Sequence, residues 1–294
     1  MHEIDAQARR SAVQTALAED HAADDVTTRW AVPADSRSHA RILARQDGVV
    51  AGLPILAEVY RQLGGDVGVS ARVKDGDRVR QGECLAELSG PSRTIITGER
   101  TALNFLQRMS GIATHAAAFV DAVAGLPVRI LDTRKTAPGL RALDKYAVAV
   151  SGASNHRLNL AAMVLLKENH IAAAGGVSAA VAAVRAHNTG AIAVEVEVET
   201  VAQAAEALHT GVEWIMLDNM SLPDMRHVVA MRAASATRLE ASGNVTLERV
   251  DAIARTGVDA ISVGAITHSA PAFDLTLLID SNQADHIRHA APHS

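Results

Sequence analysis

The sequence has 294 residues, 48% hydrophobic and 21% charged, with a formal net charge of −5 and only three Phe, two Tyr and two Trp. This length allows one large or two medium domains, while the few aromatic rings and the acidic balance disfavour nucleic acid as a partner. The single cysteine, Cys84, excludes a disulfide within the chain, and no run of about 18 apolar residues is present to span a membrane. We therefore expect a soluble, cytoplasmic protein.

The first part of the chain changes from helical to extended periodicity. Apolar spacing predicts an amphipathic helix from Ile4 to Leu17. Short strands are predicted at Ala40–Ala44 and Val67–Val73, and the Asp-Gly and Gln-Gly turns between Val73 and Glu83 indicate a hairpin. A long helical pattern from Thr97 to about Ala124 then marks the expected passage between two domains.

The rest of the chain alternates between strand and helix patterns, which predicts parallel βαβ units. Polar residues or glycine follow each apolar strand, which favours a (β/α) barrel with one mouth over an open doubly wound sheet. The sequence carries neither a glycine-rich dinucleotide motif after a strand nor a Walker-type motif. The predicted strands are Val128–Leu131, Met163–Leu166, Ile192–Val198, Trp214–Leu217, Arg238–Ala241 and Ala260–Val263, and the predicted helices are Val177–His187, Val201–His209, Leu222–Ala234 and Thr246–Arg255.

Five potentially cationic side chains follow the first two predicted barrel strands: Arg134, Lys135, His156, Arg157 and Lys167. Each one alone would be an ordinary surface charge. Arginine offers paired donors to carboxylate or phosphate, and lysine offers a compact positive charge. Gathered at one barrel mouth in an acidic protein, these side chains predict a small polyanionic ligand.

Two carboxylates and several small residues are expected at the same mouth. Glu197 belongs to the alternating run Val194–Glu199, whose glutamates share one strand face, and Asp218 ends an apolar strand. Carboxylates together with phosphate oxygens often hold magnesium, so Glu197 and Asp218 are candidate metal ligands. Ser242-Gly243-Asn244 and Gly264 follow the last two strands, where small residues suit a phosphate cradle but also ordinary turns.

A distinctive set of segments extends over nearly the whole chain: Thr97–Asn104, Asp132–Arg141, Lys145–Val148, Asn155–Arg157, Leu166–Ile171, Val196–Glu199, Met216–Asn219 and Leu239–Asn244. As a set they resemble the quinolinate phosphoribosyltransferase family, also called nicotinate-nucleotide pyrophosphorylase (carboxylating). The resemblance implies an α/β fold with an N-terminal α/β sandwich domain (1–112) and an incomplete (β/α) barrel (113–271). The C-terminal segment (272–294) is then a candidate to pack on the N-terminal domain.

The same resemblance implies a reaction and its partners. The phosphoribosyl group of 5-phosphoribosyl-1-pyrophosphate (PRPP) would pass to the ring nitrogen of quinolinate, giving nicotinate mononucleotide, pyrophosphate and CO2 for NAD biosynthesis. The resemblance further implies Mg2+ as cofactor and a homodimer or multiple of dimers. Arg134, His156 and Arg157 would bind the carboxylates of quinolinate, and Arg100 would come from the partner subunit.

The remaining roles also follow from the resemblance. Lys135 and Lys167 would neutralise pyrophosphate and substrate charge, and Glu197 and Asp218 would contact the ribose hydroxyls and magnesium. These four form the expected catalytic set. The 5-phosphate would be held by Ser242, Gly243, Asn244 and Gly264.

Some positions depart from the family pattern and leave alternatives open. Ser151–Ser154 replaces a more glycine-rich loop, Asn159–Ala162 lacks a common aspartate, and Asn244 replaces a frequent glycine. A relative that acts on another pyridine carboxylate is one alternative. A Schiff-base aldolase with Lys135 or Lys167 as nucleophile is a second, and a phosphosugar-binding protein without catalysis is a third.

Overall fold

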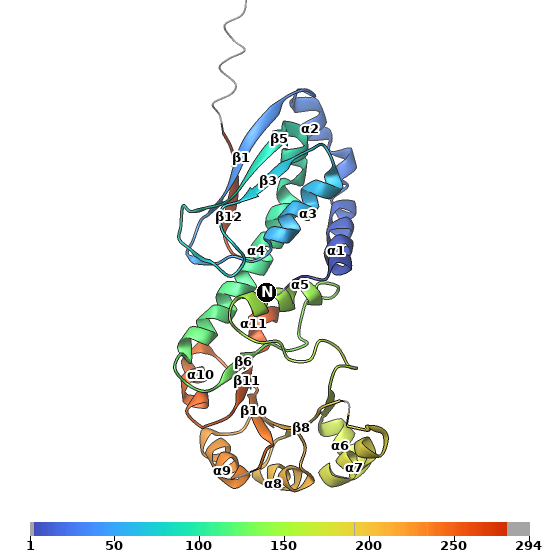
Figure 1. Ribbon diagram of the computed structural model, residues 1–294, viewed down its shortest axis with the longest axis vertical. Helices are drawn as coiled ribbons and strands as arrows, with labels where there is room; N and C mark the ends of the chain where they lie inside the picture. Colours follow the sequence, from blue (N-terminus) through green and yellow to red (C-terminus); the bar gives the residue numbers. More distant parts are fainter. Residues whose placement is uncertain (1–2, 191, 234, 281–294) are drawn as a thin grey trace, which may run out of the picture. The chain divides into compact units, whose positions relative to one another are not determined.

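The computed structural model describes residues 3–190, 192–233 and 235–280, which divide into two compact units. The first contains the residues up to His115, the segment Pro138–Ser151 and the described residues from Ala270 onward. The second contains Ala116–Ala137 and Gly152–Ser269. Helix α4 (Ser92–Ala122) begins in the first unit and ends in the second (Figure 1).

The first unit is built on an antiparallel four-stranded sheet in the order β12-β1-β5-β3. Strand β12 pairs with β1 from Ala40 opposite Ile279 to Ala44 opposite Leu275, so two segments that are far apart in the chain lie side by side in one sheet (Figure 1). Asp5 begins helix α1, because its carboxylate accepts from the Ala8 amide at 2.8 Å. The strands are β1 (Arg37–Ala44), β3 (Gly68–Ala71), β5 (Cys84–Pro91) and β12 (Leu275–Ile279), and the other helices are α1 (Ala6–Glu19), η1 (Ala22–Asp24), α2 (Val26–Ala31), α3 (Leu53–Leu63) and α5 (Arg141–Val150).

The hairpin expected between Val73 and Glu83 is wrong in its pairing. Strand β4 (Arg78–Val79) pairs with β2 (Gly48–Val49) in a separate two-stranded sheet, while β3 pairs with β5. Long-range backbone bonds hold this arrangement, including those from the Val50 amide to Asp77 and from the Gly76 amide to Val50. The turns lie where they were predicted, but β4 pairs with a strand about 30 residues earlier in the chain and not with its neighbour across the turn.

The second unit is a six-stranded parallel sheet in the order β6-β11-β10-β9-β8-β7. Among the described residues β6 and β7 are its two edges and do not pair with each other, so the barrel is incomplete as predicted. Its strands are β6 (Arg129–Leu131), β7 (Val164–Leu166), β8 (Val194–Val198), β9 (Trp214–Asp218), β10 (Arg238–Ser242) and β11 (Ala260–Ser262), and its helices include α6 (Glu168–Ala174), α7 (Val177–His187), α8 (Val201–Thr210), α9 (Leu222–Arg232), α10 (Leu247–Ala254) and α11 (Ala265–His268).

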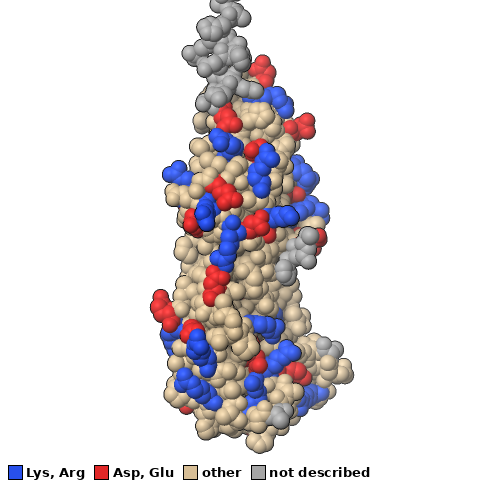
Figure 2. All heavy atoms as spheres, turned by 60° about the vertical axis from the view of Figure 1, so that its left-hand side comes forward, with Lys and Arg blue, Asp and Glu red and all other residues tan. Residues whose placement is uncertain are grey.

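Small aliphatic side chains make up most of both cores, in keeping with the composition. At the amino ends of the barrel strands, the guanidinium groups of Arg129 and Arg238 both lie over the Trp214 ring, at 5.5 and 5.4 Å from its centre. On the face drawn in Figure 2, basic and acidic side chains are intermixed. Within the described part of the chain, no helix has the length and apolarity needed to cross a membrane.

Candidate active site

The carboxyl ends of the barrel strands surround a cavity of about 550 Å3 within the second unit. Ten of the twelve residues predicted to bind substrate line it, because parallel strands deliver their ends to one edge of the sheet. These are Arg134, Lys135, His156, Arg157, Lys167, Glu197, Asp218, Ser242, Gly243 and Asn244.

The other two predicted residues, Gly264 and Arg100, are not among the residues that line the cavity. Gly264 precedes helix α11, and a Cβ at this position would come within 3.0 Å of the Lys135 side chain, so this glycine borders the cation cluster. Arg100 is an exposed residue of α4 in the first unit and does not line the cavity. The chain by itself therefore brings Gly264, but not Arg100, to the predicted site within one unit.

Two guanidinium groups, those of Arg134 and Arg157, line this cavity. The buried Nε of Arg134 has no hydrogen-bond partner among the described residues. Arg157 donates from Nη1 to the Met163 carbonyl at 3.0 Å. Burial, and next the neighbouring charge of Arg134, lowers the pKa of the Arg157 guanidinium from its usual value. Two repelling cations beside an unused donor form a good place for an anionic ligand.

The two predicted acids lie at neighbouring strand ends. The register of β7 and β8 places Leu166 opposite Val196, so Lys167 and Glu197 follow side by side and form an ion pair. Asp218 ends β9 and accepts a hydrogen bond from Nδ2 of Asn219 at 2.9 Å. Glu197 and Asp218 offer carboxylate oxygens to the cavity, the ligand type that Mg2+ prefers.

The turn after β10 has a backbone that glycine and asparagine favour. Gly243 has φ +91°, and Asn244 and Asn219 have φ +48° and +54°. Nδ2 of Asn244 donates to Oδ1 of Asn219 at 2.9 Å, and the Asn219 amide donates to the Ser242 carbonyl at 2.9 Å. A Cβ on Gly243 would overlap the Asn219 side chain. Asn219 thus belongs to the predicted phosphate cradle, although the sequence analysis assigned it no role.

Beneath His156 lies a pair of buried acids that the sequence analysis also missed as site residues. The Nε2 atom of His156 lies 3.0 Å from Oε2 of Glu195 and 3.5 Å from Oε2 of Glu240. Both glutamates are almost fully buried, and burial, followed by the charge of Glu195, raises the pKa of Glu240 to about 8. The alternating glutamates of β8 were the available signal for Glu195. Glu240 lies in the resembling segment Leu239–Asn244, but no role was predicted for it.

Asp132, at the end of β6, holds the loop that carries His156 and Arg157. Its carboxylate is fully buried and accepts from Nδ2 of Asn155 and from the backbone amide of His156, both at 2.8 Å. Such bonds join the strand to the loop at a fixed distance. Asp132 begins the segment Asp132–Arg141 that resembles the family, but no role was predicted for it.

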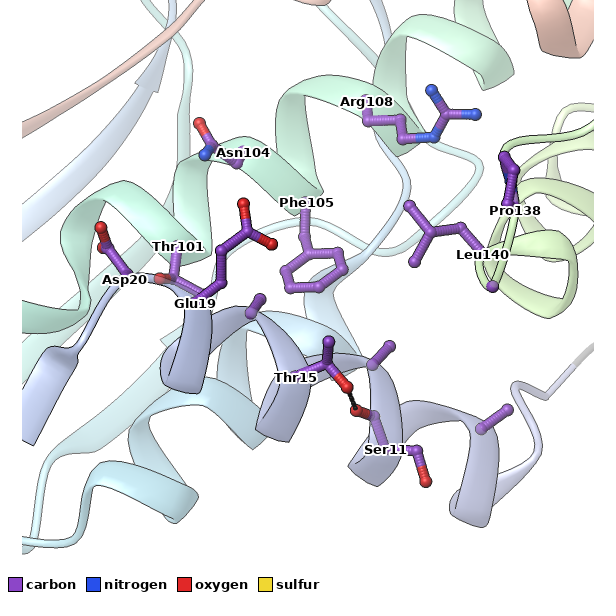
Figure 3. A pocket seen from close by; sticks show the side chains of 14 residues that line it. Ser11, Thr15, Glu19, Asp20, Thr101, Asn104, Phe105, Arg108, Pro138 and Leu140 are labelled. Atoms are coloured by element: carbon purple, nitrogen blue, oxygen red, sulfur yellow. Dashed lines mark hydrogen bonds between the residues drawn. The ribbon is translucent and has the colours of Figure 1, made fainter.

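A second cavity, of about 620 Å3, lies within the first unit between α1, α4 and the segment 138–140 (Figure 3). Its single basic residue, Arg108, is held by Asp144 through bonds of 2.9 and 2.7 Å, while Glu19 and Asp20 add negative charge. Small and apolar side chains, among them Phe105, form most of the remaining wall. This cavity is therefore unsuited to a polyanionic substrate.

Comparison with known proteins identifies the family of this fold and site. A model described as the C-terminal domain of quinolinate phosphoribosyl transferase matches residues 112–278, and one for the N-terminal domain matches residues 25–110. The chain belongs to the quinolinate phosphoribosyltransferase family. It has the two domains of that family in the order that the sequence resemblance predicted.

Individual members are similar over most of their length. Quinolinate phosphoribosyltransferase [decarboxylating] 1b of Nicotiana tabacum is 42% identical over 294 residues, covering 94% of this chain and 83% of that protein. A probable nicotinate-nucleotide pyrophosphorylase [carboxylating] of Synechocystis is 42% identical and covers 92% of both chains. The crystal structure of NadC from Streptococcus pyogenes has a TM-score of 0.90 at 37% identity and covers 96% of this chain and all of that one.

These relatives also bear on the alternatives that the sequence left open. The relatives named above are called phosphoribosyltransferases or pyrophosphorylases. The cavity agrees with that chemistry, because Lys167 is paired with Glu197 instead of being held in an apolar pocket as a Schiff-base lysine would be. Family and geometry together therefore favour phosphoribosyl transfer over an aldolase.

Proposed function

We propose that this chain transfers the phosphoribosyl group of PRPP to the ring nitrogen of quinolinate, with loss of CO2, to make nicotinate mononucleotide for NAD biosynthesis. The observation that carries the proposal is one cavity of a family barrel that combines four basic side chains with two carboxylates at its strand ends. Both substrates are polyanions, so a cationic wall is needed to bring them to reacting distance. The basic residues are Arg134, Lys135, Arg157 and Lys167.

Quinolinate has two adjacent carboxylates, and we assign them to Arg134 and Arg157. The resemblance also implied His156 as a carboxylate ligand, but its two ring nitrogens bond to the Arg157 amide and to Glu195, so we assign it no direct contact with substrate. The unused Nε of Arg134 supports this assignment, as does the mutual repulsion of the two guanidiniums, which a bound dianion would relieve. Nicotinate lacks one of these carboxylates. The proposed grip therefore predicts selectivity for the dicarboxylate.

PRPP would lie toward the later strands. The backbone turn at Ser242, Gly243 and Asn244, with Gly264 beside Lys135, would hold the 5-phosphate. Lys135 and Lys167 would neutralise the pyrophosphate, and Glu197 and Asp218 would contact the ribose hydroxyls. Charge on the leaving pyrophosphate would also be taken up by Mg2+, which the oxygens of Glu197 and Asp218 suit as ligands.

The chemistry needs no protein nucleophile. As the bond to pyrophosphate breaks, positive charge builds at the anomeric carbon, where the carboxylates of Glu197 and Asp218 would stabilise it. The ring nitrogen then forms the new C–N bond and becomes quaternary. When the adjacent carboxylate leaves as CO2, its electron pair remains on the ring carbon beside that positive nitrogen, and this carbon takes up a proton.

The quaternary structure and location complete the proposal. Arg100 is exposed on the first unit, which supports a homodimer, or a multiple of dimers, whose sites receive Arg100 from the partner subunit. We place the enzyme in the cytoplasm, which the single cysteine supports. We propose small-molecule substrates, with neither nucleic acid nor membrane as a partner.

An assay with quinolinate, PRPP and Mg2+ tests the function directly. We expect equal amounts of nicotinate mononucleotide and CO2 from quinolinate, and no nucleotide when nicotinate replaces it. Equal use of both acids would contradict the carboxylate grip. Chelation should abolish turnover and added Mg2+ should restore it, whereas turnover that persists in chelator would refute the assigned cofactor.

A further inference from the structure

Both ring nitrogens of His156 are occupied by protein groups. Its Nδ1 accepts from the backbone amide of Arg157 at 2.8 Å, and its Nε2 lies 3.0 Å from the carboxylate of Glu195. An acceptor nitrogen bears no proton, so the ring proton must be on Nε2 and point to Glu195. The geometry thus describes a neutral imidazole with one defined tautomer.

The same three side chains could be mistaken for a metal centre. Ligand atoms of His156, Glu195 and Glu240 all lie within 4.8 Å of one another. However, a histidine that binds a metal through Nε2 usually donates from Nδ1 to an acceptor, and here Nδ1 receives a hydrogen bond instead. The cluster is therefore better described as a hydrogen-bonded support than as a metal site.

The support is fixed from several sides. Glu195 and Glu240 come from β8 and β10 and are 0% and 1% exposed. The backbone of His156 is held separately by Asp132, through a 2.8 Å bond from its amide. Ring and backbone of His156 are thus anchored on different strands, which leaves this residue little freedom to move.

The fixed His156 ring also holds the backbone of Arg157 in place. Its backbone amide is bound by the His156 ring, and its guanidinium reaches the cavity next to Arg134. Two like charges would move apart if the backbone between His156 and Arg157 were free. A fixed His156 ring opposes that movement and keeps the Arg157 fork at one place in the wall.

We propose that Glu195, supported by Glu240, is a positioning residue that orients the His156 ring and through it sets the place of Arg157 for the dicarboxylate substrate. The role in catalysis rests on the proposed function. Glu195 itself would not touch substrate. Its loss should therefore weaken quinolinate binding and leave PRPP binding nearly unchanged.

Variants of Glu195 test this proposal by comparing KM values. In Glu195→Ala we expect the KM for quinolinate to rise about tenfold or more, because the charge-assisted bond to His156 is lost, with a change below about twofold for PRPP. In Glu195→Gln the amide oxygen still accepts from Nε2, so most of the quinolinate affinity should return. Glu213→Gln is the matched control, since Glu213 is exposed and caps the opposite end of β8 through the Val194 amide.

A histidine-specific 15N NMR spectrum tests the structural part independently of the reaction. The His156 signals, assigned by their loss in His156→Asn, should show a neutral ring protonated on Nε2 in the wild type. A ring protonated on Nδ1, or on both nitrogens, would overturn the proposal whatever the substrate is. If the tautomer is as expected but no nicotinate mononucleotide forms, the proposed function fails while the support of His156 stands.

Folding must be checked alongside kinetics. If Glu195→Ala does not fold, Glu195→Asp replaces it, because the shorter side chain keeps its charge but withdraws the acceptor from Nε2. Equal rises in both KM values, a loss confined to kcat, or no recovery in Glu195→Gln would each refute the positioning role. A rise restricted to quinolinate, with recovery in Glu195→Gln, would support it.

Discussion

Lys167 and Glu197 form an ion pair between the ends of two adjacent parallel strands, β7 and β8. The strand register places them side by side, so the pair follows directly from the sheet. In the proposed mechanism the lysine neutralises pyrophosphate and the carboxylate contacts the ribose hydroxyls. If these roles hold, this one contact would couple the binding of two parts of PRPP.

Removing either member of this pair should impair the reaction, and the two losses should not add. We expect Lys167→Ala and Glu197→Gln each to lower kcat/KM by about a hundredfold or more, as for other charged groups in a site. Because the residues interact, the double variant should lose less than the product of the single effects. Steady-state kinetics of the four proteins measures this coupling. Lys74→Ala, an exposed lysine of the first unit, is the control, and strict additivity would contradict the coupling.

Gly243→Ala should distort the proposed phosphate cradle. The new Cβ would both strain a backbone at φ +91° and overlap Asn219. We expect the KM for PRPP to rise at least about tenfold with little change for quinolinate, since an active-site misplacement of about 1 Å can cost a hundredfold. Gly82→Ala is a matched control, because Gly82 has φ +89° but no atom within 4 Å of its Cβ position. If both variants raise the KM for PRPP equally, backbone strain and not the overlap with Asn219 would explain the effect.

Glu240 should make the protein less stable as the pH rises. Its pKa is about 8 in the folded protein against an ordinary 4.5, so the folded state binds more protons between these values. Its contribution is therefore complete below about pH 4.5 and is lost as the pH rises through about 8. Urea unfolding of wild type and Glu240→Gln at several pH values measures the difference. An unchanged pH slope in the variant would show that this carboxyl does not titrate as described.

Mixing two inactive variants should restore activity if Arg100 is shared between subunits. Arg100→Ala and Lys167→Ala should each be inactive alone. A mixed dimer contains one site with both residues intact, so random exchange should return about a quarter of wild-type activity. Activity is measured after exchange under mild denaturant and after mixing without exchange. Mixtures that stay inactive although mixed dimers form would contradict a shared Arg100.

Much of this fold could be predicted from apolar patterns along the chain. The barrel strands match their predicted ranges within about two residues. Short runs of Val, Ile and Leu between helical segments are typical of buried parallel strands, so they are easily recognised. Helix α4 begins at Ser92, five residues before the predicted Thr97, and α5 was not predicted. In α5 the buried Asp144 and Lys145 interrupt the apolar pattern by which amphipathic helices are recognised.

The parts that could not be predicted depend on contacts between distant residues. The resemblance made the segment 272–294 a candidate to pack on the N-terminal domain, but strand β12 itself was not predicted, and its partner β1 begins more than 200 residues earlier. At the site, the charged residues were found because they follow strands, whereas Glu240 lies inside β10 and is significant only because Glu195 and His156 face it. Sequence patterns show which residues lie at the carboxyl ends of the strands, but not which buried side chains contact one another inside the barrel.

The contact of the Trp214 ring with Arg129 and Arg238 also has a spectroscopic consequence. The other indole, Trp30, is 79% exposed and belongs to the first unit, so the two units carry one tryptophan each in very different surroundings. Replacing Trp30 with Phe would leave an emission signal that reports only on the barrel. With excitation selective for tryptophan, comparison of the melting curve of Trp30→Phe with that of Trp214→Phe would show whether the two units melt together or one after the other.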